Sequence, residues 1–161
     1  MEHRFGIGYD IHRLKKGKKL VLGGVSISYP KGLDGHSDAD VLLHAICDAL
    51  LGALGEGDIG EHFPNTDKKY RGISSLVLLE KVNGLVGRRG FQITNIDTII
   101  IAEKPSLKPY KEKMKGKIAN ALLIRNNQVN IKATTQEGLG FGSGNKGIAA
   151  YAIALLTKKE R

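Results

Sequence analysis

The spacing of apolar and polar positions along the chain predicts two kinds of secondary structure. In several short segments the apolar residues form brief runs or alternate with polar ones, which is typical of β-strands. Two of these segments flank Gly23-Gly24, a pair favoured in the tight turn of a β-hairpin, so they should pair with each other. The predicted strands are Phe5 to Asp10, Leu20 to Leu22, Val25 to Ile27, Ile93 to Ala102 and Val129 to Thr134.

Other segments carry apolar residues three or four positions apart, which predicts amphipathic helices. Met114, Ile118 and Leu122 follow this spacing, for example. Ser37 or Asp38 is expected to cap the first helix, with carboxylates in its first turn. The predicted helices run from that cap to about Leu54, from Ser74 to Val86, from Tyr110 to Leu123 and from Ile148 to Leu156.

The connecting segments are rich in glycine, proline and charged residues, which favour turns and loops. They are Lys15 to Lys19, Pro30 to Gly35, Gly55 to Gly72, Pro105 to Pro109 and Gly138 to Gly147. Helices alternate with strands only in the second half of the chain, which argues against a doubly wound sheet. We therefore expect an α+β fold (an α/β sandwich) in one domain over residues 1–161. It should combine a mixed sheet of four strands with a β-hairpin and with helices on one face. The strand at 93–102 is expected to be buried on both faces at its end.

Composition restricts the class of protein. The chain of 161 residues has a formal net charge of +9, from 25 basic and 16 acidic residues, which favours anionic partners. It has no tryptophan and no aromatic RNA-binding motif, so most lysines are expected to be solvated and no nucleic-acid partner is predicted. The apolar runs are too short for a membrane span and the N-terminus lacks an apolar signal core, so we expect a cytoplasmic protein with no membrane partner.

Three residues suggest a catalytic metal site. Asp10 and His12 lie two positions apart on a predicted strand and therefore point to the same side. His44 lies on the first predicted helix, where Asp40 and Asp48 share its face and could orient a ligating imidazole. One carboxylate and two imidazoles are a common set of Zn²⁺ ligands that leaves a fourth position open. A buried, hydrogen-bonded histidine is the alternative for His44 taken alone.

Three further segments are rich in polar groups. His36-Ser37-Asp38 stands at a helix entrance, where it could cap the helix or bind phosphate. The loop from Asp58 to Asp67 could form turns only or hold a hydroxyl-rich ligand. The segment from Lys132 to Gly140 could bind a hard cation such as Mg²⁺ or Mn²⁺, or could be a strand edge with a turn.

Two motifs are rejected. Gly142 to Gly147 matches the glycine spacing of dinucleotide-binding loops, after a strand and before a predicted helix. The chain ends at Arg161, however, and leaves no room for the acidic residue that such a fold needs about 20 positions later. Cys47 lies three positions after His44 but within an apolar stretch, so it is predicted to be a small core residue rather than a nucleophile.

Taken together and in this order, these segments resemble the 2-C-methyl-D-erythritol 2,4-cyclodiphosphate synthase family over essentially the whole chain. The matching motifs are Gly8-Tyr9-Asp10-Ile11-His12, Gly35-His36-Ser37-Asp38-Ala39-Asp40, His44, Gly57-Asp58-Ile59-Gly60, Phe63-Pro64-Asn65-Thr66-Asp67 and Lys132-Ala133-Thr134-Thr135-Gln136-Glu137-Gly138-Leu139-Gly140.

The resemblance implies a reaction. The 2-phosphate of 4-diphosphocytidyl-2-C-methyl-D-erythritol 2-phosphate would attack the β-phosphorus of the same molecule, close a cyclic diphosphate and release CMP. It also implies a Zn²⁺ site at Asp10, His12 and His44, and a role for Glu137 in holding Mg²⁺ or Mn²⁺. His36 and Thr135 would stabilise the transition state.

The resemblance further implies which residues bind substrate and how chains assemble. The expected substrate contacts are Asp10, Ile11, His12, His36, Ser37, Asp58, Ile59, Gly60, Phe63, Pro64, Asn65, Thr66, Asp67, Ala102, Ser106, Leu107, Lys108, Thr134, Thr135, Gln136, Glu137 and Phe141. The segment Ala102 to Lys108 would contact cytosine. Family members form homotrimers whose sheets pack around the threefold axis, with active sites between subunits.

The chain departs from the family pattern at three positions. Asn65 stands where many relatives have aspartate, Gly138 where lysine is frequent, and Gly144 where an arginine often contacts the diphosphate. Two other functions are considered: a metal-dependent phosphodiesterase that admits water to the diphosphate, and a basic RNA-binding protein with a structural metal.

Overall fold

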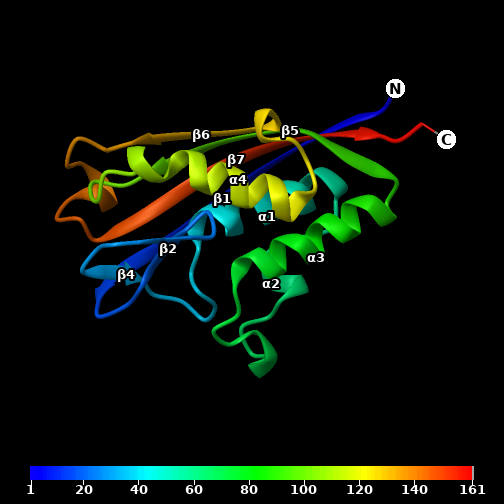
Figure 1. Ribbon diagram of the computed structural model, residues 1–161. Coiled ribbons are helices and arrows are strands. Elements are labelled where there is room, and N and C mark those ends of the chain that lie inside the picture. Colours follow the sequence, from blue (N-terminus) through cyan, green and yellow to red (C-terminus); the bar gives the residue numbers. More distant parts are fainter. Residues whose placement is uncertain (161) are drawn as a thin grey trace.

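The computed structural model describes residues 1–160 (Figure 1). Within these residues, five strands form one mixed sheet in the order β4-β1-β7-β5-β6, and a two-stranded hairpin lies beside it. Neighbouring strands of the large sheet run antiparallel, except for the parallel pair β5 and β6. The strands are β1 (His3–Lys16), β2 (Leu20–Leu22), β3 (Val25–Ile27), β4 (Lys31–Leu33), β5 (Phe91–Ile101), β6 (Val129–Thr134) and β7 (Gly147–Lys158).

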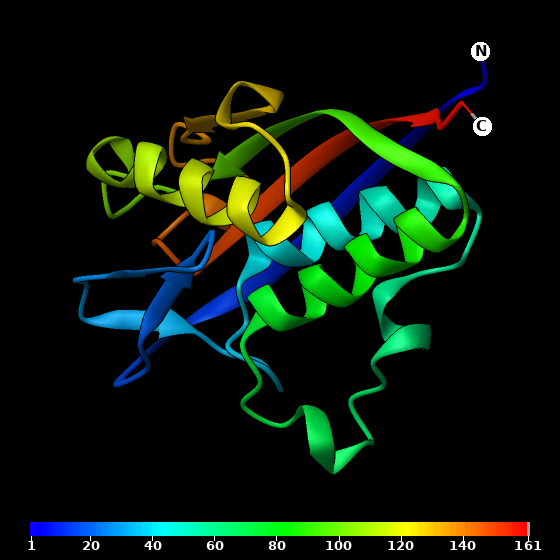
Figure 2. The same cartoon turned by 45° about the vertical axis from the view of Figure 1, so that its right-hand side comes forward.

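The helices all lie on one side of the large sheet, as the turned view shows (Figure 2). Helix α1 packs against β1 and β7, α3 lies beside α1, and α4 covers β6. This arrangement confirms the predicted α+β class. The helices are α1 (Val41–Leu54), α2 (Ile59–His62), α3 (Ser75–Arg88) and α4 (Lys111–Leu122), with 3-10 turns η1 (Lys68–Tyr70), η2 (Lys108–Tyr110), η3 (Asn126–Gln128) and η4 (Gly140–Gly142).

The prediction of a last helix over Ile148 to Leu156 was wrong, because this segment is the central strand β7. Its even-numbered residues from 148 to 156 are buried, whereas Tyr151 and Ile153 on the other face are about half exposed. Three buried positions are alanines because α1 lies close above them, and alanine suggests a helix when it is seen in sequence alone. Together with β4, which was also not predicted as a strand, β7 gives the large sheet five strands rather than four.

Three smaller predictions also needed correction. The segment Pro30 to Gly35 is not only a loop, since β4 pairs with the end of β1. The loop predicted after Gly55 contains α2 and η1. Strand β5 is not buried on both faces at its end, because Ile99 and Ile101 remain partly exposed.

Helix α1 begins later than predicted. Its N-cap is Asp40, whose side chain accepts a hydrogen bond from the backbone N–H of Leu43, and there is no acidic residue in its first turn. It ends where expected, at Gly55, which adopts the left-handed conformation with φ of 70°. The segment before α1 is thereby left free of the helix and forms part of the site described below.

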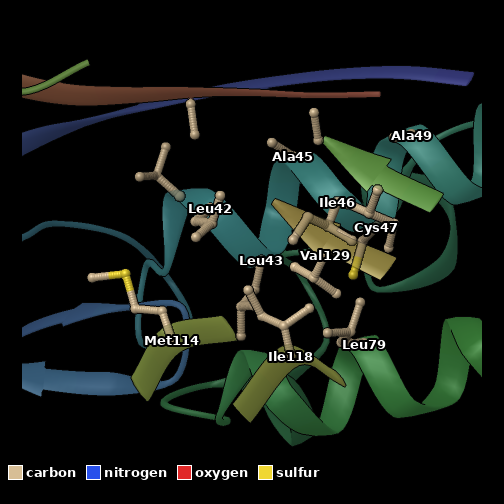
Figure 3. Close-up of a cluster of buried hydrophobic side chains, with 14 of the residues drawn as sticks. Leu42, Leu43, Ala45, Ile46, Cys47, Ala49, Leu79, Met114, Ile118 and Val129 are labelled. Carbon is tan, nitrogen blue, oxygen red and sulfur yellow. The ribbon is translucent and has the colours of Figure 1, made fainter. Parts of the chain in front are cut away.

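The hydrophobic core lies between the sheet and the helices (Figure 3). Helix α1 is at its centre: Ala45 and Ala49 face the strands, and Leu43 and Cys47 face α3 and α4. Cys47 is fully buried, as predicted, and burial raises the pKa of its thiol. A buried thiol of this kind is a packing group rather than a nucleophile.

The other face of the large sheet is apolar and exposed within the single chain. Phe5 and Ile7 are 71% and 69% exposed, and Tyr9 and Tyr151 pack with ring centroids 4.7 Å apart. These side chains form one continuous surface because β1 and β7 pair in register, Ile7 opposite Ile153 and Tyr9 opposite Tyr151. We call this surface, made by Phe5, Ile7, Tyr9, Ile11, Tyr151 and Ile153, the bare sheet face.

Candidate metal centre and substrate pockets

The site depends on an unusually close contact between β1 and α1. A Cβ atom at Gly6 would lie 1.8 Å from the carbonyl oxygen of Ala49, and one at Gly8 would lie 1.8 Å from that of Ala45. Only glycine fits at these two positions, so helix and strand backbones can touch. Asp10 and His12 follow on the same face of β1, and His44 precedes Ala45 on α1, so the close contact brings all three together.

The structure places Asp10, His12 and His44 in one cluster. Oδ2 of Asp10 lies 2.9 Å from Nε2 of His12 and 3.0 Å from Nδ1 of His44. The three potential ligand atoms lie within 4.8 Å of one another, and among residues 1–160 this is the one group of three such residues with metal-site spacing. All three side chains are mostly buried but accessible from one side.

The hydrogen bonds behind the cluster indicate where the imidazole protons are. Nδ1 of His12 lies 2.9 Å from the carbonyl oxygen of Asp34, which can only accept, so His12 carries its proton on Nδ1. Its Nε2 lone pair therefore points toward the Asp10 carboxylate. A lone pair facing a carboxylate is repulsive unless a proton or a metal cation lies between them, so this donor set fits a divalent cation.

The pKa shifts of Asp10 and His12 also indicate that the cluster favours a positive charge. Hydrogen bonding to Asp10 raises the pKa of His12, more than burial lowers it. Burial by itself raises the pKa of Asp10, but the hydrogen bonds and charges of His12 and His44 together outweigh this effect and lower it. Without a metal, the cluster therefore retains a proton that a cation would displace.

A pocket of about 240 Å³ opens onto the cluster, and we call it the metal pocket. His36 and Ser37 line it beside the three candidate ligands, and Nε2 of His36 lies 3.4 Å from the carbonyl oxygen of Asp67. Of the loop predicted to hold a hydroxyl-rich ligand, Ile59, Gly60, Phe63 and Asn65 line the pocket. Asp58, Pro64, Thr66 and Asp67 do not, and Asp58 and Asp67 instead cap α2 and η1.

A second pocket, of about 660 Å³, lies at the ends of β5 and β6, and we call it the β5–β6 pocket. It brings together Ala102, Ser106, Leu107, Lys108, Thr134 and Thr135 of the predicted substrate contacts. Gln136 and Glu137 follow on the adjoining loop and do not line it. The metal pocket and the β5–β6 pocket share no residue, so within one chain the predicted substrate contacts fall into two separate groups.

Two further predicted contacts, Ile11 and Phe141, also lie outside both pockets. The side chain of Ile11 belongs to the bare sheet face, opposite to Asp10 and His12, because alternate residues of a strand point to opposite sides. Phe141 lines a separate hollow that includes Ile11, His12 and Lys146. The glycine motif from Gly142 to Gly147 leads into strand β7 rather than a helix, which removes the remaining likeness to a dinucleotide-binding loop.

Several residues at these sites were not predicted. Tyr70, Ile73 and Leu78 line the metal pocket, and Glu103 accepts a hydrogen bond of 2.9 Å from the backbone N–H of Gln136. In a sequence, an apolar residue or an isolated acidic residue gives no local pattern that predicts lining of a pocket or support of a loop. Glu103, which also lines the β5–β6 pocket, thus holds the loop that carries Glu137.

The carboxylates expected to orient His44 have other partners. Asp40 accepts hydrogen bonds from the backbone N–H groups of Gly23 and Gly24, which attaches the β2–β3 hairpin to α1. Asp48 accepts one of 2.8 Å from the N–H of Ile59, which positions the wall of the metal pocket. The contacts of His44 Nε2 are the hydroxyls of Ser75 at 2.8 Å and Ser37 at 3.2 Å.

Comparison with known proteins agrees with this fold. The model of the YgbB family matches residues 3–157, and the chain belongs to this family. A protein of Clostridium botulinum named 2-C-methyl-D-erythritol 2,4-cyclodiphosphate synthase is 58% identical over 156 residues, which cover 97% of this chain and 99% of that relative.

Two solved structures are similar over nearly the whole chain. The bifunctional IspDF of Campylobacter jejuni superposes with a TM-score of 0.95 at 40% identity, and the match covers 99% of this chain and 43% of that longer one. IspF of Plasmodium falciparum, solved as a CDP complex, superposes with a TM-score of 0.86 at 35% identity, covering 98% of this chain and 97% of that one.

Proposed function

We propose that the protein converts 4-diphosphocytidyl-2-C-methyl-D-erythritol 2-phosphate into 2-C-methyl-D-erythritol 2,4-cyclodiphosphate and CMP. An oxygen of the 2-phosphate attacks the β-phosphorus, a new P–O bond forms, and the bond to the CMP oxygen breaks. The observation that carries the proposal is the convergence of Asp10, His12 and His44 beside the metal pocket in a chain of this family.

Asp10, His12 and His44 fit a Zn²⁺ ion, since their ligand atoms converge and at least one imidazole lone pair faces the carboxylate. When bound, such an ion would supply Lewis-acid polarisation of a phosphoryl oxygen. The protein residues orient the reacting groups. Because attack is intramolecular, orientation alone can contribute about 7–11 kcal/mol in well-aligned cases, and no covalent nucleophile is needed.

The metal pocket suits the methylerythritol phosphate part of the substrate. His36 and Ser37 offer an imidazole and a hydroxyl for phosphoryl oxygens, while Asn65 offers an amide for a hydroxyl group. His36 is proposed to stabilise the charge that develops during attack. Asp58, Pro64, Thr66 and Asp67 would support this wall from behind rather than touch the ligand through their side chains.

The β5–β6 pocket suits the cytidine diphosphate part. Lys108, Thr134 and Thr135 lie at its surface, where a cation and hydroxyls can bind phosphate oxygens. Glu137 presents an exposed carboxylate on the adjoining loop. This is compatible with Mg²⁺ or Mn²⁺, because Mg²⁺ is usually held by one or two carboxylates together with substrate phosphates.

We further propose that the protein forms a homotrimer with its active sites between subunits. Two observations support this. The bare sheet face exposes a continuous apolar surface of the kind that marks an association site. The two groups of substrate contacts also occupy separate pockets of one chain, so a neighbouring subunit could complete each site. The cytoplasmic location and the single domain over residues 1–161 stay predictions from the sequence.

The test is incubation with the CDP-linked substrate, with and without a chelator, followed by mass analysis of the products. A cyclic diphosphate together with CMP, formed only when metal is available, is the expected result. A linear phosphate would show that water is admitted and that the protein is a phosphodiesterase. Absence of any reaction in the metal-loaded protein would overturn the proposal.

A further inference from the structure

The hydrogen-bond chain behind His44 leads to two residues that the proposed reaction does not use. Nε2 of His44 lies 2.8 Å from the hydroxyl of Ser75, the first residue of α3, and that hydroxyl is bonded to Oδ1 of Asp38. Ser75 is fully buried. The chain thus connects α1, α3 and the segment before α1 at a single point.

The direction of these hydrogen bonds follows from the groups themselves. Both oxygens of Asp38 accept from backbone N–H groups, Oδ1 from Asp40 at 3.2 Å and Oδ2 from Ser75 at 3.0 Å. An ionised carboxylate has no proton to give, so the contact with the Ser75 hydroxyl uses the hydroxyl proton. The hydroxyl can then only accept from His44, and Nε2 of His44 must carry a proton.

The second hydroxyl near His44 is compatible with this assignment. The oxygen of Ser37 lies 3.2 Å from Nε2 and also accepts from the backbone N–H of Ala39. The Ser37 contact is longer than the Ser75 contact, and Ser37 is less buried. The Ser37 hydroxyl can share the same proton, but no carboxylate fixes its direction. Ser75 is therefore the group that determines the state of the His44 ring.

We propose that Asp38 and Ser75 are positioning residues of the metal centre. Asp38 fixes the direction of the Ser75 hydroxyl, and the hydroxyl keeps the proton of His44 on Nε2, so that the Nδ1 lone pair faces Asp10 and His12. This inference rests on the proposed metal-dependent function. Partners behind a ligating histidine hold its tautomer and ring orientation, and their loss typically weakens metal affinity 10- to 100-fold.

The first experiment compares the zinc affinity of the wild-type chain with those of Ser75→Ala and Ser74→Ala, by competition with a coloured chelator. Ser74 is a matched control, because it loses a hydroxyl at the same helix end, where the exposed side chain caps α3 by accepting a hydrogen bond of 3.3 Å from the N–H of Leu76. We expect Ser75→Ala to bind zinc about 10- to 100-fold more weakly and Ser74→Ala to be unchanged. Asp38→Asn should also weaken binding, because an amide no longer dictates the direction of the hydroxyl.

The second experiment measures the ring nitrogens of His44 by nitrogen NMR in the zinc-loaded protein. We expect the proton on Nε2 in the wild type, with the signal sheltered from solvent exchange, and loss of that shelter in Ser75→Ala. A purely structural role of Ser75 would change stability without changing this signal. Ser75→Thr keeps the hydroxyl and should retain the signal and the zinc affinity.

The outcomes separate this inference from the proposed function. If the wild type binds zinc and forms the cyclic diphosphate, but folded Ser75→Ala binds zinc equally well, only the inference is overturned. If the wild type neither binds zinc nor cyclises its substrate, both are overturned. Should Ser75→Ala not fold, the wild-type spectrum decides: a proton on Nδ1 of His44, with Nε2 bare, contradicts the proposal.

Discussion

At the scale of single residues, protons and a metal cation compete for the same ligand atoms. This competition predicts how zinc binding depends on pH. The hydrogen bond to Asp10 raises the pKa of His12 above its usual range, so the metal-free site keeps its proton to a higher pH than a free imidazole does. Zinc must displace it. Apparent zinc affinity should therefore fall as the pH drops through the raised pKa of His12, and zinc binding in that range should release a proton.

Calorimetry in two buffers of different ionisation enthalpy measures this release. The stability of the metal-free protein depends on pH in the opposite direction at the high-pH side, because there the proton on His12 is stabilising. In metal-free protein the Asp10–His12 pair contributes fully between pH 3.8 and 6.5, is lost as pH rises through the raised pKa of His12, and is lost again as pH falls through the lowered pKa of Asp10. His12→Asn should remove the loss of stability at high pH and weaken the loss at low pH, where His44 still lowers the pKa of Asp10. Zinc binding to the wild type without proton release would contradict the assignment.

Exchanging single residues should separate binding of the metal from catalysis. His44→Ala removes a predicted ligand and should abolish both zinc binding and turnover, whereas Glu137→Ala should leave zinc bound and slow cyclisation only. Metal analysis and product formation measured on the same preparations check this. A His44→Ala protein with full zinc content, or undiminished cyclisation in Glu137→Ala, would refute the respective role.

Sequence spacing was sufficient to predict the three candidate ligands but not what lies behind them. Asp10 and His12 share a strand face, and that much follows from a period of two. The partner of His44 was sought on its own helix at Asp40 and Asp48, whereas the structure supplies it from Ser75, 31 positions later. Contacts between distant segments depend on how elements pack, and a single sequence carries no periodic signal for them.

At the scale of elements, the contact between α1 and β1 predicts the effect of a single methyl group. Gly8→Ala would place a Cβ atom 1.8 Å from the carbonyl oxygen of Ala45, so helix and strand must separate. Overpacking of this kind typically costs about 1–3 kcal/mol, occasionally more, and here it also moves His44 away from Asp10. We expect lower stability in urea and weaker zinc binding.

Gly52→Ala is the matched control for this prediction. Gly52 lies on the exposed side of α1, where a Cβ would meet its nearest atom, the carbonyl oxygen of Ile7, at an ordinary 3.8 Å. The same substitution should stabilise the helix by up to about 1 kcal/mol and leave zinc binding intact. If the two variants behaved alike, the close contact would not be what positions the ligands.

The same contact explains why the element prediction failed where it did. The hairpin around Gly23-Gly24 and strand β6 were predicted correctly, because turn residues and short apolar runs are local signals. Strand β7 was mistaken for a helix because the close approach of α1 selects alanine at positions 150, 152 and 154. The requirement that makes the metal site possible thus concealed the central strand from sequence analysis.

At the scale of the whole molecule, the bare sheet face predicts that assembly and metal binding can be separated. The three candidate ligands come from one chain, whereas the two substrate pockets are proposed to meet only between chains. Ile7→Glu puts a charge in the middle of the bare sheet face, next to Ile153. An unpaired charge buried at an interface is strongly unfavourable, so this variant should dissociate the proposed trimer and lose cyclisation while still binding zinc.

Leu123→Glu is the control, because Leu123 is 86% exposed after α4 and is not part of the bare sheet face. Light scattering coupled to gel filtration should give three times the chain mass for the wild type and for Leu123→Glu, and one chain mass for Ile7→Glu. A monomeric Ile7→Glu protein that cyclised at the wild-type rate would show that one chain holds a complete site. In that case the two pockets must meet within the subunit, by a movement of the loops that carry His36 and Glu137.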